Sequence, residues 1–369
     1  MGRLRLGMVG GGQGAFIGAV HRIAARIDDE WELVAGALSS TPEKALASGK
    51  ELGLPEDRIY SSYEKMAKAE ASRDDGIDAV AIVTPNHMHA GPAVAFLNAG
   101  INVICDKPLA NDMDGAHAIA DAVKASGKHF ILTHNYTGYP LIRMAKDMVA
   151  HGDLGSLRFV VAEYIQDWLT EEADPDNKQA AWRTDPARSG AGGTIGDIGT
   201  HAFNLVSFVT GLEVSEISGE LTTFVPGRRV DDNVTAQLRF KGGAKGTIWA
   251  SQVAVGHENG LSLRVYGDKG GLTWGQENPN FMTFTPFGQP AQILTRGGAS
   301  PIGTPSGLRT PPGHPEGWLE GFATIYKDAA TLIRGGDATL PTVTDGLSGM
   351  RFIQSCIESN SKNGEWIQY

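Results

Sequence analysis

The chain has 369 residues, 41% hydrophobic and 20% charged, values typical of a soluble globular protein with room for two domains. Its formal charge of −10 argues against nucleic acid as the main partner, because phosphate binding needs a basic surface. No apolar run reaches the roughly 18–20 residues of a membrane span, so we expect no membrane partner. With only Cys105 and Cys356, and a predicted strand close to Met1 that leaves no room for a leader peptide, we expect a cytoplasmic protein.

A glycine-rich turn between a strand and a helix opens the chain. The apolar run Leu4–Val9 predicts a buried strand, and Ala15–Arg26 has the composition of a helix. The turn between them fits the pattern Gly-x-Gly-x-x-Ala, which binds dinucleotides in this context through the helix N–H groups. A glycine-rich loop without a ligand is the alternative. The predicted cofactor-binding residues of this turn are Gly10, Gly12, Gln13, Gly14 and Ala15.

Strands and helices then alternate up to residue 134. Apolar runs predict strands at 31–38, 78–84, 102–105 and 129–133. Helical segments separate these runs, and two of them end at Gly100 and Gly127. This alternation predicts an α/β fold with a parallel, doubly wound sheet that is covered on both faces. We assign residues 1–134 to a Rossmann NAD(P)-binding domain.

The pattern changes from residue 135 onwards. We expect a helix, a long strand, an irregular polar segment and a second helix at 139–151, 157–168, 170–193 and 194–210. Strands joined by turns follow from 214 to 274, with hairpins at 241–246 and 267–271. The Pro- and Gly-rich residues 275–316 predict an excursion that could cover a site, and two helices at 316–334 and 345–361 close the chain.

Residues 135–369 therefore form a predicted α+β domain for substrate binding and oligomerisation. Strands joined by turns rather than by helices predict a large, open, mainly antiparallel sheet. An uncovered apolar sheet face is costly in water, so we expect a homodimer or homotetramer built through this sheet.

The residues that would hold the adenosine ribose bear on the choice between NAD and NADP. Proteins that use NAD carry an acidic residue at the end of the second strand, whereas Ser39 stands there in this chain and Ser40 follows. Lys44 could pair with the 2′-phosphate of NADP, or it could be a solvated helix residue. The predicted cofactor is NAD or NADP, with a slight preference for NADP.

Two segments carry side chains suited to alcohol oxidation. Asp106-Lys107-Pro108 follows a strand at the carboxyl edge of the sheet, where ligands bind in such folds. A lysine there can stabilise or protonate a substrate oxygen, although a surface lysine in a turn would look the same. Asp197 and His201 are four residues apart and would share one helix face, with the imidazole as proton acceptor. A capping Asp and a packed His are the alternative.

Several segments together resemble the Gfo/Idh/MocA family, that of glucose–fructose oxidoreductase and inositol dehydrogenase. The main ones are GMVGGGQGAFIGAVHR at 7–22, VTPNHMHAGPAVAFLNAGINVICDKPLA at 83–110 and GGTIGDIGTHAFNL at 192–205. Residues 133–155 and 313–326 resemble it more weakly, and the resemblance covers most of the chain. It implies that Lys107, Asp197 and His201 are catalytic and that the Lys107–Pro108 peptide is cis. It also implies nicotinamide contacts from Thr84, Pro85, Asn86 and His89.

The chain departs from the family pattern at two places. Glu usually precedes the Lys-Pro pair, whereas this chain has Asp106, which is shorter by one methylene. The ribose-binding acid is missing at Ser39. We include Asp106 and Lys107 among the predicted cofactor-binding residues, and the missing acid leaves NAD and NADP open.

The resemblance implies an NAD(P)-dependent oxidoreductase that transfers a hydride between nicotinamide and a secondary hydroxyl or ketone of a sugar, inositol or related polyol. A redox-assisted glycoside hydrolase of the same fold and a non-catalytic dinucleotide-sensing regulator are the alternatives. Aromatic faces stack on sugar rings, and amides or charged groups bind hydroxyls. The predicted substrate residues are Asn135, Tyr136, Tyr164, Gln166, Trp168, Trp182, Arg183, His201, His257 and His314.

A His-x-His pair at His87 and His89 is the one pattern that could suggest a metal. The pair sits at a predicted helix start, no third and fourth ligand lie nearby in the sequence, and hydride transfer needs no metal. We therefore expect no metal site.

Overall fold

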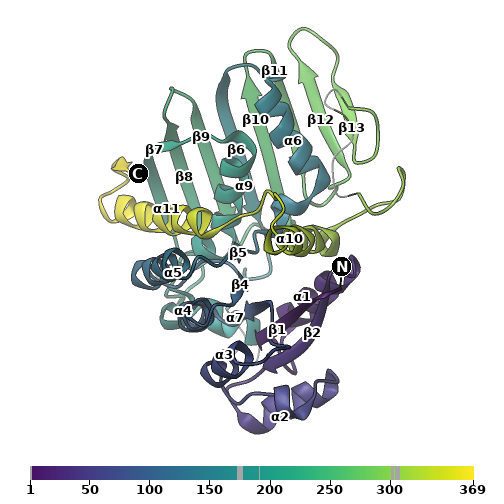
Figure 1. The fold of residues 1–369 in the computed structure, drawn as a ribbon. Coiled ribbons are helices and arrows are strands. Elements are labelled where there is room, and N and C mark those ends of the chain that lie inside the picture. The colour runs from purple at the N-terminus through teal and green to yellow at the C-terminus, as the bar shows by residue number, and fades with distance from the viewer. Residues whose placement is uncertain (1, 173–177, 191, 301–302, 304–307) are drawn as a thin grey trace. The chain divides into compact units, whose positions relative to one another are not determined.

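The computed structural model describes residues 2–172, 178–190, 192–300, 303 and 308–369. The chain forms two compact units, one of residues 1–135 and 319–347 and the other of residues 136–318 and 348–369 (Figure 1). The domain boundary between residues 134 and 135 stays a prediction. Residues 319–347 belong to the first unit although they lie near the end of the chain.

The first unit contains a parallel five-stranded sheet, as the alternating pattern predicted. Its strands lie in the order β2-β1-β3-β4-β5. All residues of the central strand β3 are buried, because helices cover both faces of such a sheet. The α/β Rossmann fold is thereby confirmed. The strands are β1 (Leu4–Gly10), β2 (Trp31–Ala37), β3 (Ala79–Val83), β4 (Asn102–Cys105) and β5 (Phe130–Leu132).

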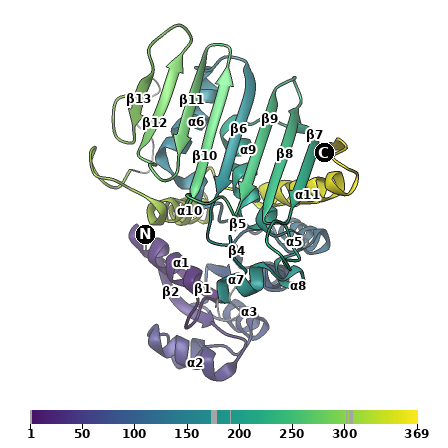
Figure 2. The ribbon, with the colours of Figure 1, turned by 180° about the vertical axis from the view of Figure 1, so that it is seen from behind.

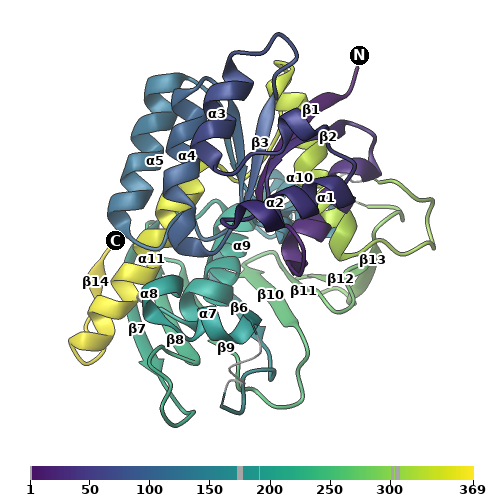
Figure 3. The same cartoon turned by 90° about the horizontal axis from the view of Figure 1, so that it is seen from below.

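Helices lie on both faces of this sheet. Figure 3 shows α3, α4 and α5 side by side on one face, and α1 and α10 on the other. Two hydrogen bonds join Tyr326 of α10 to residues of α1 and β2, one between its hydroxyl and His21 Nδ1 (2.8 Å) and one from Trp31 Nε1 to its carbonyl (2.8 Å). The helices are α1 (Phe16–Ile27), α2 (Pro42–Glu51), η1 (Glu56–Arg58), α3 (Tyr63–Ala71), η2 (Asn86–Met88), α4 (Ala90–Asn98), α5 (Met113–Ser126) and, from Leu319 onwards, α10 (Trp318–Ile333).

The second unit is built on a nine-stranded sheet in the order β13-β12-β11-β10-β6-β9-β8-β7-β14. Neighbouring strands are antiparallel except for β6 and β9, which are parallel, so the predicted mainly antiparallel sheet is confirmed. The strands are β6 (Leu157–Ile165), β7 (Val214–Thr222), β8 (Asn233–Phe240), β9 (Lys245–Ser251), β10 (Gly260–Gly267), β11 (Gly270–Gly275), β12 (Phe281–Pro286), β13 (Gln292–Thr295) and β14 (Ile367–Gln368).

One face of this sheet packs under helices, and the opposite face is mostly polar. α6 and α9 lie on the covered face (Figure 1), where buried residues alternate along β8 from Val234 to Phe240. Figure 2 shows the other face, over which no helix of the unit's described residues lies. Its side chains include Gln237 and the ion pair of Arg264 with Glu163 (2.9 Å). Exposed Phe159, Tyr266, Phe281 and Ile293 lie on the same face, so the open face is mixed, and the oligomer expected through it stays a prediction. The helices are η3 (Asn135–Gly138), α6 (Pro140–His151), α7 (Lys178–Arg183), α8 (Pro186–Ser189), η4 (Ile195–Gly199), α9 (Thr200–Thr210) and α11 (Val343–Ser361), of which η3 and α11 have residues in both units.

Two segments expected to be irregular contain regular structure. The excursion at 275–316 contains the hairpin of β12 and β13, which extends the sheet. The segment 170–193 contains α7 and α8, and α8 starts where the Asp185 carboxylate accepts from Ala187 N (3.2 Å) ahead of Pro186. The remainder of these segments includes residues 173–177, 191, 301–302 and 304–307, which lie outside the described part.

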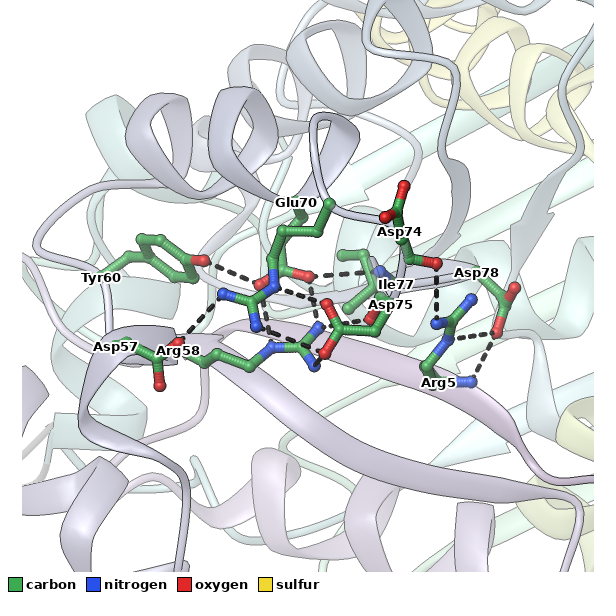
Figure 4. Close-up of polar contacts among 10 residues, drawn as sticks. Arg5, Asp57, Arg58, Tyr60, Glu70, Asp74, Asp75, Ile77 and Asp78 are labelled. Atoms are coloured by element: carbon green, nitrogen blue, oxygen red, sulfur yellow. Dashed lines mark hydrogen bonds and ion pairs between the residues drawn. The ribbon is translucent and has the colours of Figure 1, made fainter.

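A buried ion pair fixes the segment that leads into β3. Arg58 and Glu70 are 5% and 2% exposed, and their side chains are joined by a salt bridge and by a bond from Arg58 Nε to Glu70 Oε1 (3.1 Å) (Figure 4). The same carboxylate accepts from the Tyr60 hydroxyl (2.7 Å) and from Ile77 N (3.2 Å). Glu70 therefore ties α3 to the chain on both sides of it.

We expect Glu70→Ala to lower the free energy of unfolding by about 3–5 kcal/mol, because it removes the buried carboxylate that pairs with Arg58 and leaves that charge only the more distant and exposed Asp75 (3.6 Å). Asp57→Ala is the matched control, since Asp57 pairs with Arg73 at the exposed end of the same network (3.0 Å) and should cost below about 1 kcal/mol. Urea unfolding followed by circular dichroism measures both. Equal losses in the two variants would contradict this role of Glu70.

Candidate functional site

The glycine turn after β1 adopts the backbone conformation that its sequence predicts. Gly10, Gly11 and Gly14 have φ angles of 79°, 72° and 78°, a region that other residues adopt only at a cost. A Cβ at Gly14 would meet no atom within 4 Å, so this side of the turn is open. No described side chain caps α1 at Ala15, and its first turn has no acidic residue. Such a helix start favours an anion.

Two glycines of this region are required by close packing against other parts of the protein. A Cβ on Gly12 would lie 2.6 Å from the Leu38 carbonyl oxygen, and one on Gly18 would lie 2.4 Å from Gly11 Cα. The close approach of α1 to the turn therefore depends on Gly18, which the Gly-x-Gly-x-x-Ala pattern does not contain. Gln13 is held from α2, through its N–H to Ser48 Oγ (3.0 Å) and its side chain to Glu51 Oε2 (2.7 Å).

The residues after β2 form a polar and open surface. Ser40 and Lys44 are exposed, and Ser39 is half-buried with its hydroxyl accepting from Thr41 N (3.1 Å). Thr41 and Pro42 begin α2, so Lys44 lies in the first turn of that helix.

The loop after β3 is held by its own backbone. Thr84 Oγ1 donates to the Met88 carbonyl (3.0 Å), and Asn86 is buried. His89 is fully buried, with Nδ1 at 2.7 Å from the Pro108 carbonyl and Nε2 at 2.9 Å from the Thr84 carbonyl. His89 thus joins the loop with Pro85 to the loop with Pro108. Among the described residues, no three His, Cys, Asp or Glu side chains are grouped as a metal site requires.

Asp106 is an ionised carboxylate at the end of β4. Its Oδ1 accepts from Thr133 Oγ1 (2.8 Å) and lies 3.6 Å from Nε2 of the buried His21. Burial by itself raises the pKa of Asp106, but His21, Lys107 and Thr133 together outweigh it and bring the pKa to about 2. The Lys107–Pro108 peptide that follows is cis, as the resemblance implied.

Two buried residues follow β5 in the same unit. Burial, with a smaller effect from the charge of Lys107, lowers the pKa of His134 to about 3, so its imidazole is neutral at pH 7. Asn135 is also buried, and its Nδ2 has no hydrogen-bond partner among the described residues. Sequence reasoning selected Asn135 and missed His134, whose only signal was its position at a strand end.

In the second unit, Asp231 holds the start of the helix that bears Asp197 and His201. Its carboxylate accepts from Gly193 N (2.6 Å) and Ile195 N (2.8 Å), and its carbonyl accepts from Thr194 N (3.0 Å). A Cβ on Gly193 would lie 2.3 Å from that carbonyl oxygen, which explains the glycine. The chain then forms the π-helical turn η4, a feature frequent at functional sites.

Asp197 lies in this turn and is bound from two other elements. Its Oδ2 accepts from Arg183 Nε (3.0 Å) and from Gln252 Nε2 (2.8 Å). The guanidinium of Arg183 lies over the rings of Trp182 (4.3 Å) and Trp168 (5.8 Å). The structure therefore brings these three predicted substrate residues together beside Asp197, and it adds Gln252, which sequence reasoning missed.

His201 is buried against two tyrosines. Its ring lies edge-on to Tyr136 with a centroid distance of 4.9 Å, and 6.0 Å from Tyr164. The two hydroxyls are 2.6 Å apart, and burial raises the pKa of both phenols. Tyr136, Tyr164 and His201 thus form one cluster, to which Gln166 and Trp168 are joined by hydrogen bonds.

Two predicted substrate residues make no side-chain hydrogen bond to the described residues of these clusters. His257 and His314 are exposed, and neither imidazole has a hydrogen bond to a described residue. His257 is in the turn before β10, and the backbone carbonyl of His314 accepts from Arg296 Nη2 (2.5 Å).

Comparison with known proteins gives a consistent result over both units. Residues 4–134 match the oxidoreductase family with an NAD-binding Rossmann fold, and residues 142–273 match the GFO/IDH/MocA C-terminal domain. A crystal structure of an oxidoreductase from Sinorhizobium meliloti is 52% identical, covers 100% of both chains and superposes with a TM-score of 0.91.

Two further similar proteins have more specific descriptions. An inositol dehydrogenase homologue from Azotobacter vinelandii, solved with NADH and myo-inositol, is 32% identical over 100% of this chain and 98% of its own, with a TM-score of 0.92. Levoglucosan dehydrogenase from Pseudarthrobacter phenanthrenivorans is 27% identical over 100% of this chain and 98% of its own. None of the described helices is both long and apolar enough to cross a membrane.

The charge state of Asp231 predicts a pH dependence of stability. Burial raises its pKa from 3.8 to about 6, against the lowering effect of the Ile195 and Gly193 N–H groups. The folded chain then binds this proton more tightly than the unfolded chain, so the free energy of unfolding falls as the pH rises from about 4 to about 6. The total loss is about 3 kcal/mol.

Asp231→Asn removes this titration, so its free energy of unfolding relative to wild type should rise by about 3 kcal/mol from pH 4 to pH 7. Urea unfolding at both pH values measures the difference. A wild-type-to-variant difference that does not change with pH would rule out this titration.

Proposed function

The chain belongs to the GFO/IDH/MocA oxidoreductase family, an NAD-binding dehydrogenase family, and we propose that it transfers a hydride between nicotinamide and a secondary alcohol of a sugar, inositol or related polyol. The observation that carries the proposal is the open glycine turn that leads into an uncapped helix start, with Asp106 and Lys107 at a strand end of the same unit. The fit is chemical as well, because backbone N–H groups and a positive helix end suit a pyrophosphate.

The cofactor-binding residues would divide by the part of the dinucleotide they hold. We assign the pyrophosphate to the turn at 10–15, and the ribose to Ser39, Ser40 and Lys44. The nicotinamide side is assigned to residues of three loops, Thr84, Pro85, Asn86, His89, Asp106 and Lys107. When bound, the cofactor supplies the redox chemistry by accepting or giving a hydride.

The chain's own residues would handle the proton and the charge. In the direction of oxidation, the His201 imidazole takes the proton of the substrate hydroxyl. The Lys107 ammonium stabilises the negative charge that develops on that oxygen. Asp197, held by Arg183 and Gln252, orients the substrate or the imidazole. We propose that these three residues act together on one substrate.

The substrate class is supported by chemistry and by similar proteins. Tyr136, Tyr164 and Gln166 offer polar groups beside His201, and Trp168 and Trp182 offer aromatic faces, a combination that suits a ring with several hydroxyls. Asn135 adds a buried amide donor without a partner among the described residues. The similar structures solved with NADH include one with myo-inositol and one with levoglucosan.

Two finer statements stay predictions. A homodimer or homotetramer through the C-terminal sheet now depends on aromatic side chains interspersed on its mostly polar open face, such as Phe159 and Tyr266. A cytoplasmic location rests on the sequence alone. The polar side chains of the open face favour an oligomer interface that retains bound water over one that excludes it.

The function is tested with a panel of sugars, inositols and anhydrosugars incubated with the chain and NAD or NADP, followed by absorbance of the reduced nicotinamide. We expect turnover of at least one polyol. Lys107→Ala and His201→Ala should each lower kcat/KM by about 100-fold or more, and His201→Ala should leave cofactor affinity within about threefold. Lys124→Ala and His151→Ala are matched controls with exposed side chains.

Each alternative gives a different result in this assay. Cleavage of a nitrophenyl glycoside without net change in nicotinamide would identify a redox-assisted glycoside hydrolase. Cofactor binding without turnover of any polyol or glycoside would identify a dinucleotide sensor. Wild-type rates in both Lys107→Ala and His201→Ala would refute the residue roles.

Cofactor preference is tested separately. If Lys44 binds the 2′-phosphate, Lys44→Ala should lower kcat/KM with NADP about tenfold and leave the value with NAD unchanged. Ser39→Asp should act in the same direction by charge repulsion. Lys50→Ala is the control, because Lys50 lies in the last turn of the same helix and pairs with Glu56 (2.8 Å). An unchanged ratio in Lys44→Ala would show that Lys44 plays no part.

A further inference from the structure

A single amide outside the predicted site joins most of the polar residues around His201. Asn259 immediately precedes β10 and is half-buried. Its Oδ1 accepts from the Tyr164 hydroxyl (2.8 Å) and from Gln166 Nε2 (2.7 Å). Its Nδ2 donates to Gln276 Oε1 (3.0 Å) and, at 3.5 Å, approaches the Tyr136 hydroxyl. Asn259 therefore uses both its acceptor and its donor groups.

These bonds impose one direction on the protons of the cluster. The only hydroxyl proton of Tyr164 is used toward Asn259, so in the contact of 2.6 Å between the two phenols Tyr136 is the donor. Gln166 gives an N–H to Asn259, and its Oε1 accepts from Trp168 Nε1 (3.0 Å). The tyrosine protons therefore point along the chain of bonds toward Asn259.

This direction limits what the tyrosines can offer to a ligand. With their protons committed, the two phenols can only accept hydrogen bonds, and Tyr136 already accepts one from Trp318. The lone pair left for a ligand is therefore that of Tyr164, and a ligand group that meets it must donate a hydrogen bond. A hydroxyl can do so, and a carbonyl, an ether oxygen or a methylene lacks the proton. Because the His201 ring packs against both tyrosines, this requirement acts next to the group assigned to proton transfer.

We propose that Asn259 is a specificity-determining residue that makes the Tyr136–Tyr164 pair accept a hydrogen bond from a substrate hydroxyl, so that polyols are distinguished from their deoxy analogues. The inference rests on the proposed function and deepens it. Asn259 acts through Tyr136, Tyr164 and Gln166, and is therefore a positioning residue.

Two substitutions separate the direction of the bonds from mere packing. Asn259→Asp keeps the oxygen that accepts from Tyr164 and Gln166, so the tyrosine protons keep their direction. Asn259→Leu removes the acceptor and releases both phenol protons. Asn233→Leu is the matched control, because Asn233 is also half-buried in this unit and accepts a bond from a tryptophan, Trp249 Nε1 (2.9 Å).

The experiment measures kcat and KM for the best polyol substrate and for its monodeoxy analogues. We expect wild type to prefer the polyol over one deoxy analogue by at least about tenfold in kcat/KM. Asn259→Leu should reduce this preference to about onefold, mainly through KM of the polyol, with KM of the cofactor unchanged. Asn259→Asp and Asn233→Leu should retain it.

Loss of the preference in both Asn259 variants, or its retention in Asn259→Leu, would overturn the inference while the dehydrogenase assignment stands. If wild type turns over no polyol, the proposed function fails, and the thermal shifts given by the same compounds then test the inference. The inference is supported if the polyol gives a larger thermal shift than its deoxy analogue and only Asn259→Leu loses this difference. The inference is overturned if all variants show the same difference in thermal shift, or if no polyol shifts the melting temperature.

Discussion

The positions of Asp197 and His201 in the second unit depend on three consecutive backbone N–H groups that all donate to a single residue. Gly193, Thr194 and Ile195 all donate to Asp231, and the chain enters a π-helical turn directly afterwards. This turn is wider than an α-helical one, so the spacing of Asp197 and His201 differs from that in a regular helix. The irregular start is thus fixed by hydrogen bonds from the main chain to Asp231, and none of these bonds involves the side chains of Asp197 or His201.

In the first unit the corresponding constraint is the balance of charge around Lys107. Asp106 stays ionised although it is only partly exposed, because His21, Lys107 and Thr133 favour its charged form. His134 stays neutral, because burial and the nearby positive charge disfavour its protonation. The side chain of Asp106 is one methylene shorter than the usual Glu, yet Thr133 and His21 still reach its carboxylate. The departure from the family pattern therefore leaves the anionic neighbour of Lys107 in place.

Local patterns in the sequence were sufficient for most of the fold and failed where distant segments meet. The uniformly apolar β3 and the alternating β8 each carry their signal within a few residues. The packing of α10 in the first unit depends instead on contacts such as Trp31 with Tyr326, 295 residues apart. The strands β12 and β13 were hidden in a Pro- and Gly-rich segment, because their pairing with β11 and with each other stabilises them more than composition suggests.

The candidate site divides in the same way. Lys107, Asp197 and His201 could be selected from residue type and spacing, whereas Gln252, Asp231 and Asn259 could not, because their importance lies in what they touch. In the sequence, Asn259 has the pattern of an ordinary turn residue before a glycine. Only its hydrogen-bond partners distinguish it from other turn residues. An amide both accepts and donates, so it can hold two phenols and two other amides in one arrangement. Since a fully bonded network has one favoured proton direction, the choice of ligand becomes a matter of which partner carries the proton.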